Sequence, residues 1–283
     1  MFRKKLLIVL ATFFNDIKLL LIKDYDILLM ERVIAMNERH TKILDLLTKE
    51  KKVEVSKLSQ LLGVSQVTIR KDLDQLESTG VLIREHGYAK LNENDDINNR
   101  LAYRYDSKQK IALWTCQMVE DNETIMIESG SCCALLALEI AKQKKNVTII
   151  TNSTFIADFV RKNGGVKIIL LGGEYQMESQ VNVGPMTKAC LETFYVDKLF
   201  IGVDGFNEKT GFTGSDYMRG ETVRDMVKQA NQVIILTDSR KFGQQGLINL
   251  VSLSQVSTVI TDGDISSKFE TYLQEKNINV VKV

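Results

Sequence analysis

The sequence is poor in the residues that mark metal-bound or disulfide-stabilised proteins. Its 283 residues include one proline, one tryptophan, two histidines and four cysteines. The cysteines Cys116, Cys132, Cys133 and Cys190 form no CxxC pair, so a structural zinc site lacks ligands. Adjacent cysteines seldom bridge each other, and reduced thiols are typical of the cytosol. We therefore expect a cytoplasmic protein with no metal and no cofactor.

An excess of charge of one sign is also missing. Lys and Arg number 37, Asp and Glu number 36, and the formal net charge is +1. No overall field therefore draws the chain to nucleic acid or to a membrane, and any basic surface must be local. The length allows roughly two domains, and the 44% hydrophobic content is that of a globular protein.

Residues 1–35 are an extension with several interpretations. "MFRKKLLIVLATFF" has a basic start and an apolar run that is too short to span a membrane. The extension is either the product of a start codon assigned too far upstream, an amphipathic segment, or an anchor at the membrane surface. We favour the first, with Met30 or Met36 as the true start, because a complete domain pattern begins only at Asn37.

Residues 36–91 carry the pattern of three helices followed by two strands. Apolar residues recur at helical spacing in "NERHTKILDLLTKEKK", "VEVSKLSQLLG" and "SQVTIRKDLDQLESTG", and Gly63 and Gly80 end the second and third of these. "VLIREHGYAKL" then alternates around a His-Gly turn. This order predicts a winged helix-turn-helix domain, with the helix-turn-helix at about residues 53–72.

The third helix has an unusual exposed face. Ile69, Leu73 and Leu76 share one side, whereas Val67 and Lys71 point away from it. A solvated helix seldom exposes a valine beside basic residues, but a helix in the DNA major groove can place it against a thymine methyl group. Spacing alone also allows a small helical bundle with a chance surface valine. We predict DNA contacts from Ser65, Val67, Thr68, Arg70, Lys71, Arg84 and His86.

The second half of the chain alternates strands and helices. Residues 92–107 are polar and acidic, so we expect a linker there, followed by a second domain over residues 108–283. The strand-like runs are "ETIMI", "NVTII", "VKIILL", "DKLFIGV", "QVIILT", "VSTVIT" and "INVVKV". They predict an α/β fold with a mostly parallel sheet. Pro185, the lone proline, is expected in the first turn of a helix.

The loops after these strands are rich in small and polar residues. "IESGS" opens a helix whose backbone N–H groups could bind an anion, although a tight turn explains its glycine equally well. Because the carboxyl ends of parallel strands meet at one edge, five such loops together predict a site for a small phosphorylated ligand. We assign to it Ser129, Gly130, Ser131, Thr151, Asn152, Gly172, Gly173, Asp204, Glu221 and Lys241.

These motifs resemble the DeoR family of bacterial transcriptional regulators. "VSQVTIRKDLDQLESTG" followed by "REHG" is similar to the family's DNA-binding domain, and "IESGS", "TNS", "LGGEY", "VGP", "DKLFIGVDG", "TDSRKFG" and "VITD" occur in the family order. The resemblance covers about Asn37 to Val283. It implies a ribose-phosphate-isomerase-like sensor domain that binds a phosphorylated sugar without turning it over. It also implies homo-oligomers on paired DNA operators that repress genes of sugar uptake and catabolism.

The sequence departs from the family pattern at two loops. The family usually has Asp and then Gly-Thr-Thr-Thr where this chain has Glu128 and the thiols of Cys132 and Cys133, which are weak donors. Anion binding could therefore rest on backbone N–H groups alone, and a redox-sensing cysteine pair is a second hypothesis. In the wing, Tyr88 replaces the second glycine of His-Gly-Gly-Ala, where a positive φ would be strained.

Two alternative functions stay open at this point. The first is a phosphosugar isomerase-like enzyme with an appended helical domain, in which Asp204, Glu221 and Lys241 would act as acid and base groups. The second is a regulator tethered to a membrane by its extension. We favour a DNA-binding regulator that is not an enzyme, because the N-terminal motif is specific, and we expect no stable membrane insertion.

Overall fold

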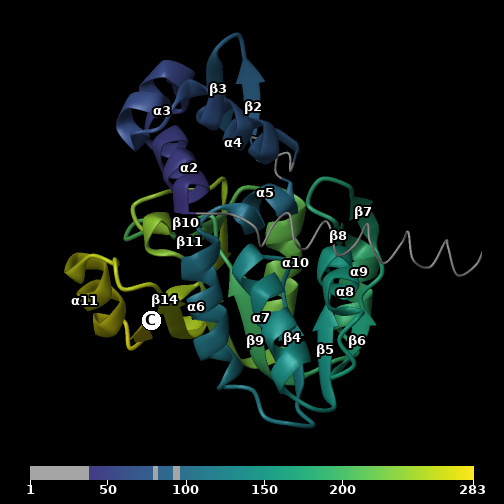
Figure 1. The fold of residues 1–283 in the computed structure, drawn as a ribbon. Coiled ribbons are helices and arrows are strands. Elements are labelled where there is room, and N and C mark those ends of the chain that lie inside the picture. Colours follow the sequence, from purple (N-terminus) through teal and green to yellow (C-terminus); the bar gives the residue numbers. More distant parts are fainter. Residues whose placement is uncertain (1–37, 79–81, 92–95) are drawn as a thin grey trace, which may run out of the picture. The chain divides into compact units, whose positions relative to one another are not determined.

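The computed structural model describes residues 38–78, 82–91 and 96–283, which divide into two units at residues 93 and 94 (Figure 1). The extension at residues 1–35 and the expected helix end at Gly80 lie outside the described residues. Within the described ranges, no helix is both long enough and apolar enough to cross a membrane.

The first unit is a winged helix-turn-helix, as predicted. Its elements are α2 (Glu38–Glu50), β1 (Lys52–Glu54), α3 (Val55–Leu62), α4 (Gln66–Ser78), β2 (Leu82–Glu85) and β3 (Tyr88–Leu91). Gly63 ends α3 in the left-handed conformation, with φ +68°. Ser65 caps α4, since its Oγ accepts the N–H of Thr68 at 3.1 Å. The sequence pattern missed β1, which pairs with β3.

A buried charge network orients α4 against α2. The buried Asp72 of α4 accepts hydrogen bonds from Arg39 Nε at 2.6 Å and Arg39 Nη2 at 2.8 Å. The ring Nε2 of His40 lies 3.2 Å from the same carboxylate. Burial raises the pKa of Asp72, but these partners outweigh burial and hold it below its usual value. The fork between Arg39 and Asp72 therefore fixes the rotation of α4 and so sets which face it exposes.

In the turn of the wing, the positive φ angles are at His86 and Gly87. His86 has φ +36° and Gly87 has φ +88°, the combination that joins antiparallel strands by a two-residue turn. Tyr88 lies in β3 and pairs with Glu85 of β2. Strain at Tyr88 does not arise, because the tyrosine is the first residue of a strand and has no positive φ.

The second unit is built on seven parallel strands in the order β15-β14-β12-β9-β4-β5-β6. These strands are β4 (Thr124–Ile127), β5 (Val147–Thr151), β6 (Val166–Leu170), β9 (Val196–Gly202), β12 (Ala230–Leu236), β14 (Val256–Thr261) and β15 (Asn279–Lys282). Each contains or overlaps a run predicted as a strand. The chain reverses its direction across the sheet between β4 and β9, and ligands bind at such a switch point in open α/β sheets.

Helices cover both faces of this sheet. They are α5 (Ile97–Ala102), α6 (Tyr105–Cys116), α7 (Ser131–Gln143), α8 (Thr154–Val160), α9 (Pro185–Leu191), α10 (Tyr217–Val227) and α11 (Ser267–Glu275). Figure 1 shows α6 and α7 side by side on one face. The helices α9, α10 and α11 share a core with apolar residues of β9, β12 and β14. Pro185 is the first residue of α9, as predicted.

Short elements complete the second unit. Two antiparallel sheets are formed by β7 (Glu174–Gln176) with β8 (Val181–Val183), and by β10 (Gly205–Asn207), β11 (Gly211–Gly214) and β13 (Ile248–Val251). The 3-10 helices are η1 (Ser239–Lys241) and η2 (Leu253–Gln255). The sequence pattern did not distinguish these hairpins from loops.

The stretch predicted as a linker, residues 92–107, is largely helical where the structure describes it. It contains α5 and the start of α6. Ile97, Leu101 and Ala102 of α5 are almost completely buried. Ile97 and Leu101 lie one helical turn apart, so their burial stabilises the helix. The polar residues between them concealed this spacing in the sequence.

Candidate functional site

The first two turns of α4 present the residues predicted to contact DNA. The side chain of Val67 is 60% exposed, and Arg70 and Lys71 are exposed beside it. The hydroxyl groups of Ser65 and Thr68 lie 3.0 Å apart at the start of the helix. The structure therefore brings five of the seven predicted residues onto one solvent-facing surface, which we call the α4 face.

The two predicted wing residues differ in their surroundings. Arg84 pairs with Asp74 of α4, and its backbone N–H donates to Glu77 at 3.0 Å. His86 is exposed at the turn. The guanidinium of Arg84 therefore ties the wing to α4 and would have to exchange Asp74 for a phosphate in order to contact DNA.

The second unit contains a cavity at the carboxyl ends of β4, β9 and β12. Its enclosed volume is about 120 Å³, and it opens to solvent. Its lining comes from α5, α6, the loops after β4 and β9, α10 and η1. The polar lining residues include Arg100, Tyr103, Lys108, Glu128, Ser131, Asp204, Ser215, Asp216, Arg219, Asp238 and Lys241.

Four of the ten predicted ligand residues line this cavity: Gly130, Ser131, Asp204 and Lys241. The other six do not, namely Ser129, Thr151, Asn152, Gly172, Gly173 and Glu221. Most of those six make structural contacts instead. Asn152 Nδ2 donates to the carbonyl of Asn182 at 3.0 Å, and Glu221 pairs with Arg224 on α10. A side chain at Gly173 would collide with Thr187 Oγ1, so this glycine serves close packing.

Glu128 occupies one of the N–H groups expected to bind an anion, that of Gly130. Its Oε2 accepts the N–H of Gly130 at 2.8 Å and that of Gly202 at 3.3 Å, and its Oε1 accepts the hydroxyl of Ser129 at 2.6 Å. A Cβ atom on Gly130 would lie 3.0 Å from the Cα of Gly202, so the two loops touch. The backbone N–H groups at the start of α7, from Ser131 onward, are left to face a ligand.

The cysteine pair that follows this loop is buried. Burial raises the pKa of Cys132 to about 12 and that of Cys133 well above its usual value. Cys133 Sγ lies 3.6 Å from the carbonyl oxygen of Phe200. Because the thiolate is the reactive form, this environment argues against the redox-sensing hypothesis.

Lys108 is a buried cation that faces the cavity. Its side chain donates to the carbonyl of Arg100, the residue is 4% exposed, and within the described residues it has no carboxylate partner. Burial lowers the pKa of Lys108 to about 8, and the positive charges of Lys241 and Arg100 also lower it, whereas Cys132 and Asp238 raise it. An anionic ligand would supply the missing counter-charge.

A carboxylate lies opposite these cations. Lys241 Nζ is 4.0 Å from Asp204 Oδ1, and the N–H of Ser215 donates to Asp204 Oδ2 at 2.8 Å. Burial raises the pKa of Asp204, but Lys241, Arg100 and the Ser215 N–H outweigh burial and lower it. The cavity thus pairs cations suited to a phosphate with an ionised acceptor suited to hydroxyl groups.

Sequence reasoning missed several residues of the cavity. Arg100 and Tyr103 lie in the stretch predicted as a linker, and Lys108 follows directly. Arg219 and Asp238 were also absent from the predicted set. The signal for the first three was available in "INNRLAYRYDSK", where basic and aromatic residues alternate with apolar residues at helical spacing.

Comparison with known proteins covers nearly all of the described chain. Residues 39–95 match the DeoR-like helix-turn-helix domain, and residues 103–263 match the DeoR C-terminal sensor domain. Ribose 5-phosphate isomerase A from Methanocaldococcus jannaschii matches 49% of this chain and 54% of its own at 19% identity, with a TM-score of 0.36.

Three curated relatives align over most of their own length. The transcriptional repressor GlcR of Bacillus subtilis is 31% identical over 80% of this chain and 88% of its own. The regulator GolR of Listeria innocua is 28% identical over 86% and 97%, and the glycerol-3-phosphate regulon repressor of Escherichia coli is 27% identical over 81% and 92%. The chain belongs to the DeoR family of DNA-binding transcriptional regulators.

Proposed function

We propose that this regulator is a repressor of genes for sugar uptake or catabolism and that a phosphorylated sugar releases it from DNA. The observation that carries the proposal is the cavity at the switch point of the sheet, with the buried ammonium of Lys108 beside the first turn of α7. The names of related repressors, among them that of the glycerol-3-phosphate regulon, support a phosphorylated effector.

In this proposal, cations of the cavity bind the phosphate and a carboxylate binds the sugar. The phosphate would lie against Lys108 and the N–H groups at the start of α7, and Lys241 would contact the phosphate or a sugar oxygen. Asp204 would accept hydrogen bonds from sugar hydroxyl groups, which an ionised carboxylate does well. An isomerase is not favoured, because the chain belongs to a family of regulators and because Glu221, one of its three candidate acid and base groups, lies outside the cavity.

DNA would be read by the α4 face and positioned by the wing. Val67 would contact a thymine methyl group, and Arg70 or Lys71 would contact guanine or phosphate, while Ser65 and Thr68 would bind phosphate. Arg84 and His86 would contact the backbone beside the groove. We infer a DNA-binding domain at residues 36–91 and a sensor domain that begins before residue 108, because α5 and the start of α6 belong to the second unit. We also infer a homo-oligomer that places two α4 faces on paired half-sites.

The effector half of the proposal is tested by titrating full-length protein with pentose, hexose, hexitol and amino-sugar phosphates. Calorimetry should find one compound that binds. Phosphorus NMR should show only the signal of that compound after prolonged incubation with the protein. Conversion of the compound into an isomer would contradict the proposal and favour the enzyme. Absence of binding by all of the compounds would contradict the choice of effector.

A further inference from the structure

The segment that joins α5 to α6 forms one wall of the cavity. We call residues 100–108 the elbow. Arg100, Tyr103 and Lys108 line the cavity from this side. The elbow is also close in sequence to the DNA-binding unit, since α5 is the first helix that the structure describes after β3. A ligand in the cavity therefore touches the part of the sensor unit that the DNA-binding unit is attached to.

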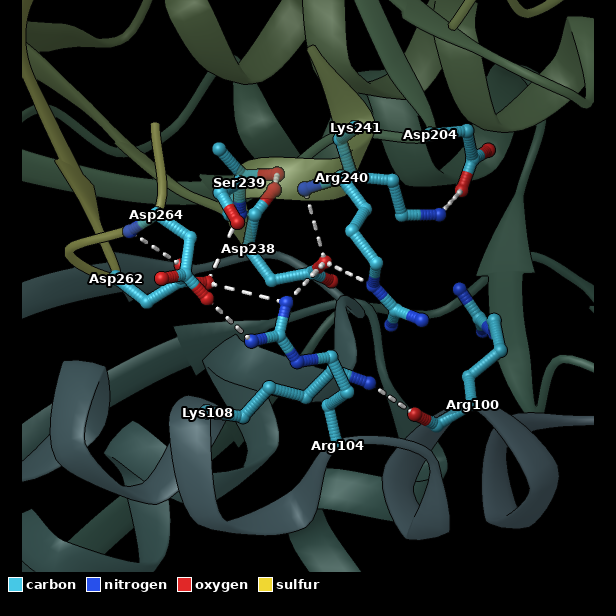
Figure 2. Close-up of polar contacts among 11 residues, drawn as sticks. Arg100, Arg104, Lys108, Asp204, Asp238, Ser239, Arg240, Lys241, Asp262 and Asp264 are labelled. Atoms are coloured by element: carbon cyan, nitrogen blue, oxygen red, sulfur yellow. Dashed lines mark hydrogen bonds and ion pairs between the residues drawn. The ribbon is translucent and has the colours of Figure 1, made fainter. Parts of the chain in front are cut away.

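Arg104 holds the elbow from outside the cavity, in the middle of three carboxylates. Its guanidinium lies 3.2 Å from Asp264, 3.7 Å from Asp262 and 3.9 Å from Asp238 (Figure 2). These carboxylates follow two different strands, β12 and β14. Arg104 itself does not line the cavity. It therefore joins the elbow to the carboxyl ends of two core strands without occupying the ligand's space.

The backbone at Arg104 supports this role. Arg104 adopts a left-handed conformation, φ +49° and ψ +42°, between the last turn of α5 and the first turn of α6. A non-glycine residue pays for this conformation, so the surrounding contacts must hold it. One of these contacts is the carboxylate of Asp262, whose pKa is lowered. Burial raises its pKa, but the Ser239 hydroxyl and N–H, the Asp264 N–H and Arg104 outweigh burial and lower it.

A second contact holds the same segment, and we call it and the Arg104 contacts together the clamp. The guanidinium of Arg240 stacks on the ring of Tyr103, 3.8 Å from its centroid. Arg240 also donates to Asp238 at 3.1 Å, the carboxylate that Arg104 approaches. Asp238 lines the cavity. The ligand site and the clamp therefore share one carboxylate and one aromatic ring.

We propose that Arg104 is a positioning residue that holds the elbow against the cavity, so that effector binding reaches the DNA-binding unit through α5. This inference rests on the proposed function for its effector, but the clamp itself does not. A bound anion would draw Lys108 and Arg100 toward it and change the strain on the elbow that Arg104 anchors. Without the anchor, the effector would still bind, and the DNA-binding unit would no longer respond.

The clamp is tested first without any effector. Arg104→Asn removes the guanidinium and keeps a residue that tolerates the left-handed conformation. Cys132 lines the cavity, whereas Cys116 is buried at the far end of α6 and does not line it. Alkylation at each cysteine, read by mass spectrometry, should rise about tenfold at Cys132 and stay unchanged at Cys116. Arg161→Asn, which removes an exposed pair with Asp158, is the matched control and should leave both unchanged.

The coupling is tested next on the full-length protein and a labelled promoter fragment. The probe is the sugar phosphate of the panel that releases wild-type protein from this DNA. For Arg104→Asn, the dissociation constants for DNA with and without the probe should become equal, while calorimetry still detects binding of the probe. Asp264→Asn, which changes a 77% exposed carboxylate of the clamp, should reduce the coupling in the same direction.

Each outcome bears on one claim. Equal increases at Cys132 and Cys116 would mean that Arg104 only stabilises the fold, and would overturn the inference. Release of Arg104→Asn from DNA at the wild-type probe concentration would overturn it as well. If no compound of the panel releases the wild-type protein, the proposed function fails, and the alkylation rates still decide whether Arg104 holds the elbow.

Discussion

A hydrogen bond between Glu128 and Gly202 joins β4 and β9, the two strands between which the chain reverses its direction across the sheet. The carboxylate that follows β4 accepts the backbone N–H at the end of β9 at 3.3 Å, and it accepts the N–H of Gly130 at 2.8 Å. The residue that replaces the family's aspartate therefore closes the floor of the cavity. It leaves the start of α7 and the cations above it to meet a ligand.

Replacement of Glu128 by Ala should destabilise the second unit. The N–H groups of Gly130 and Gly202 and the Ser129 hydroxyl would lose their shared carboxylate acceptor. This loss costs about 2–3 kcal/mol of the free energy of unfolding. Urea unfolding followed by circular dichroism measures this loss. Glu120→Ala, an exposed carboxylate ahead of β4, is the control and should change the free energy by less than about 0.5 kcal/mol. Similar losses in the two variants would contradict the role of Glu128.

The buried ammonium of Lys108 should make stability depend on pH. Its pKa is about 8 in the folded protein against 10.5 for an unperturbed lysine. Between these values the unfolded chain binds a proton that the folded protein does not, so the free energy of unfolding rises with pH. Below pH 8 the charged form is buried at a cost of about 3 kcal/mol.

Lys108→Met should therefore be more stable than the wild type at pH 7, by about 2 kcal/mol after the loss of the hydrogen bond to Arg100. The advantage should shrink above pH 8 and vanish near pH 10.5. Thermal unfolding at a series of pH values measures both. A variant that is less stable at every pH would show that the ammonium is compensated in the folded protein.

The affinity for the effector should fall as the pH rises, whereas the free energy of unfolding rises. A bound phosphate stabilises the ammonium form, so above pH 8 the binding of a sugar phosphate must take up a proton, and the dissociation constant should rise about tenfold per pH unit. Calorimetry in buffers of different ionisation enthalpy detects the proton directly. A dissociation constant that stays flat from pH 8 to 9.5 would remove Lys108 from the phosphate site.

Arg70→Ala should weaken specific DNA binding. The side chain lies on the α4 face, and loss of a base or phosphate contact costs about 1–3 kcal/mol, a 5- to 150-fold rise in the dissociation constant. Anisotropy at one stated salt concentration measures this. Arg161→Ala, an exposed arginine of the second unit, should leave affinity unchanged. Equal affinities for Arg70→Ala and the wild type would exclude Arg70 from the interface.

Lys241→Ala should leave DNA binding intact and weaken the response to effector. Its ammonium faces Asp204 across the cavity, and loss of a charge-assisted contact should raise the half-release concentration about tenfold or more. Lys228→Ala at the C-cap of α10, where the lysine pairs with Asp225, removes an equivalent charge at an exposed position. A Lys241 variant that responds like the Lys228 variant would place Lys241 outside the site.

The parallel strands were predictable, because strands buried on both faces are nearly continuous apolar runs. The run "QVIILT" that became β12 is an example. The hairpin β10–β11 was not, since its strands are short and rich in glycine and depend on contacts with β13. The helix α5 was missed because only Ile97, Leu101 and Ala102 reveal it, and their burial needs the rest of the unit.

The site was predictable only in part, for a related reason. Loops at the carboxyl ends of strands converge by topology, so Gly130, Ser131, Asp204 and Lys241 followed from sequence order. Asn152 shares this position but bonds the backbone at Asn182 instead, because polar residues at strand ends also satisfy neighbouring hairpins. Arg100 reaches the cavity because α5 packs beside it. This helix precedes the first strand of the sheet, so the order of the strands does not predict its place.

The measurement that tests the account most directly is fluorescence anisotropy of the full-length protein on the promoter region beside its own gene, at fixed salt, with the sugar-phosphate panel. The account predicts specific binding to this DNA and release by one compound of the panel at low concentration. Specific binding that none of the phosphorylated sugars alters, or absence of specific binding, would contradict it.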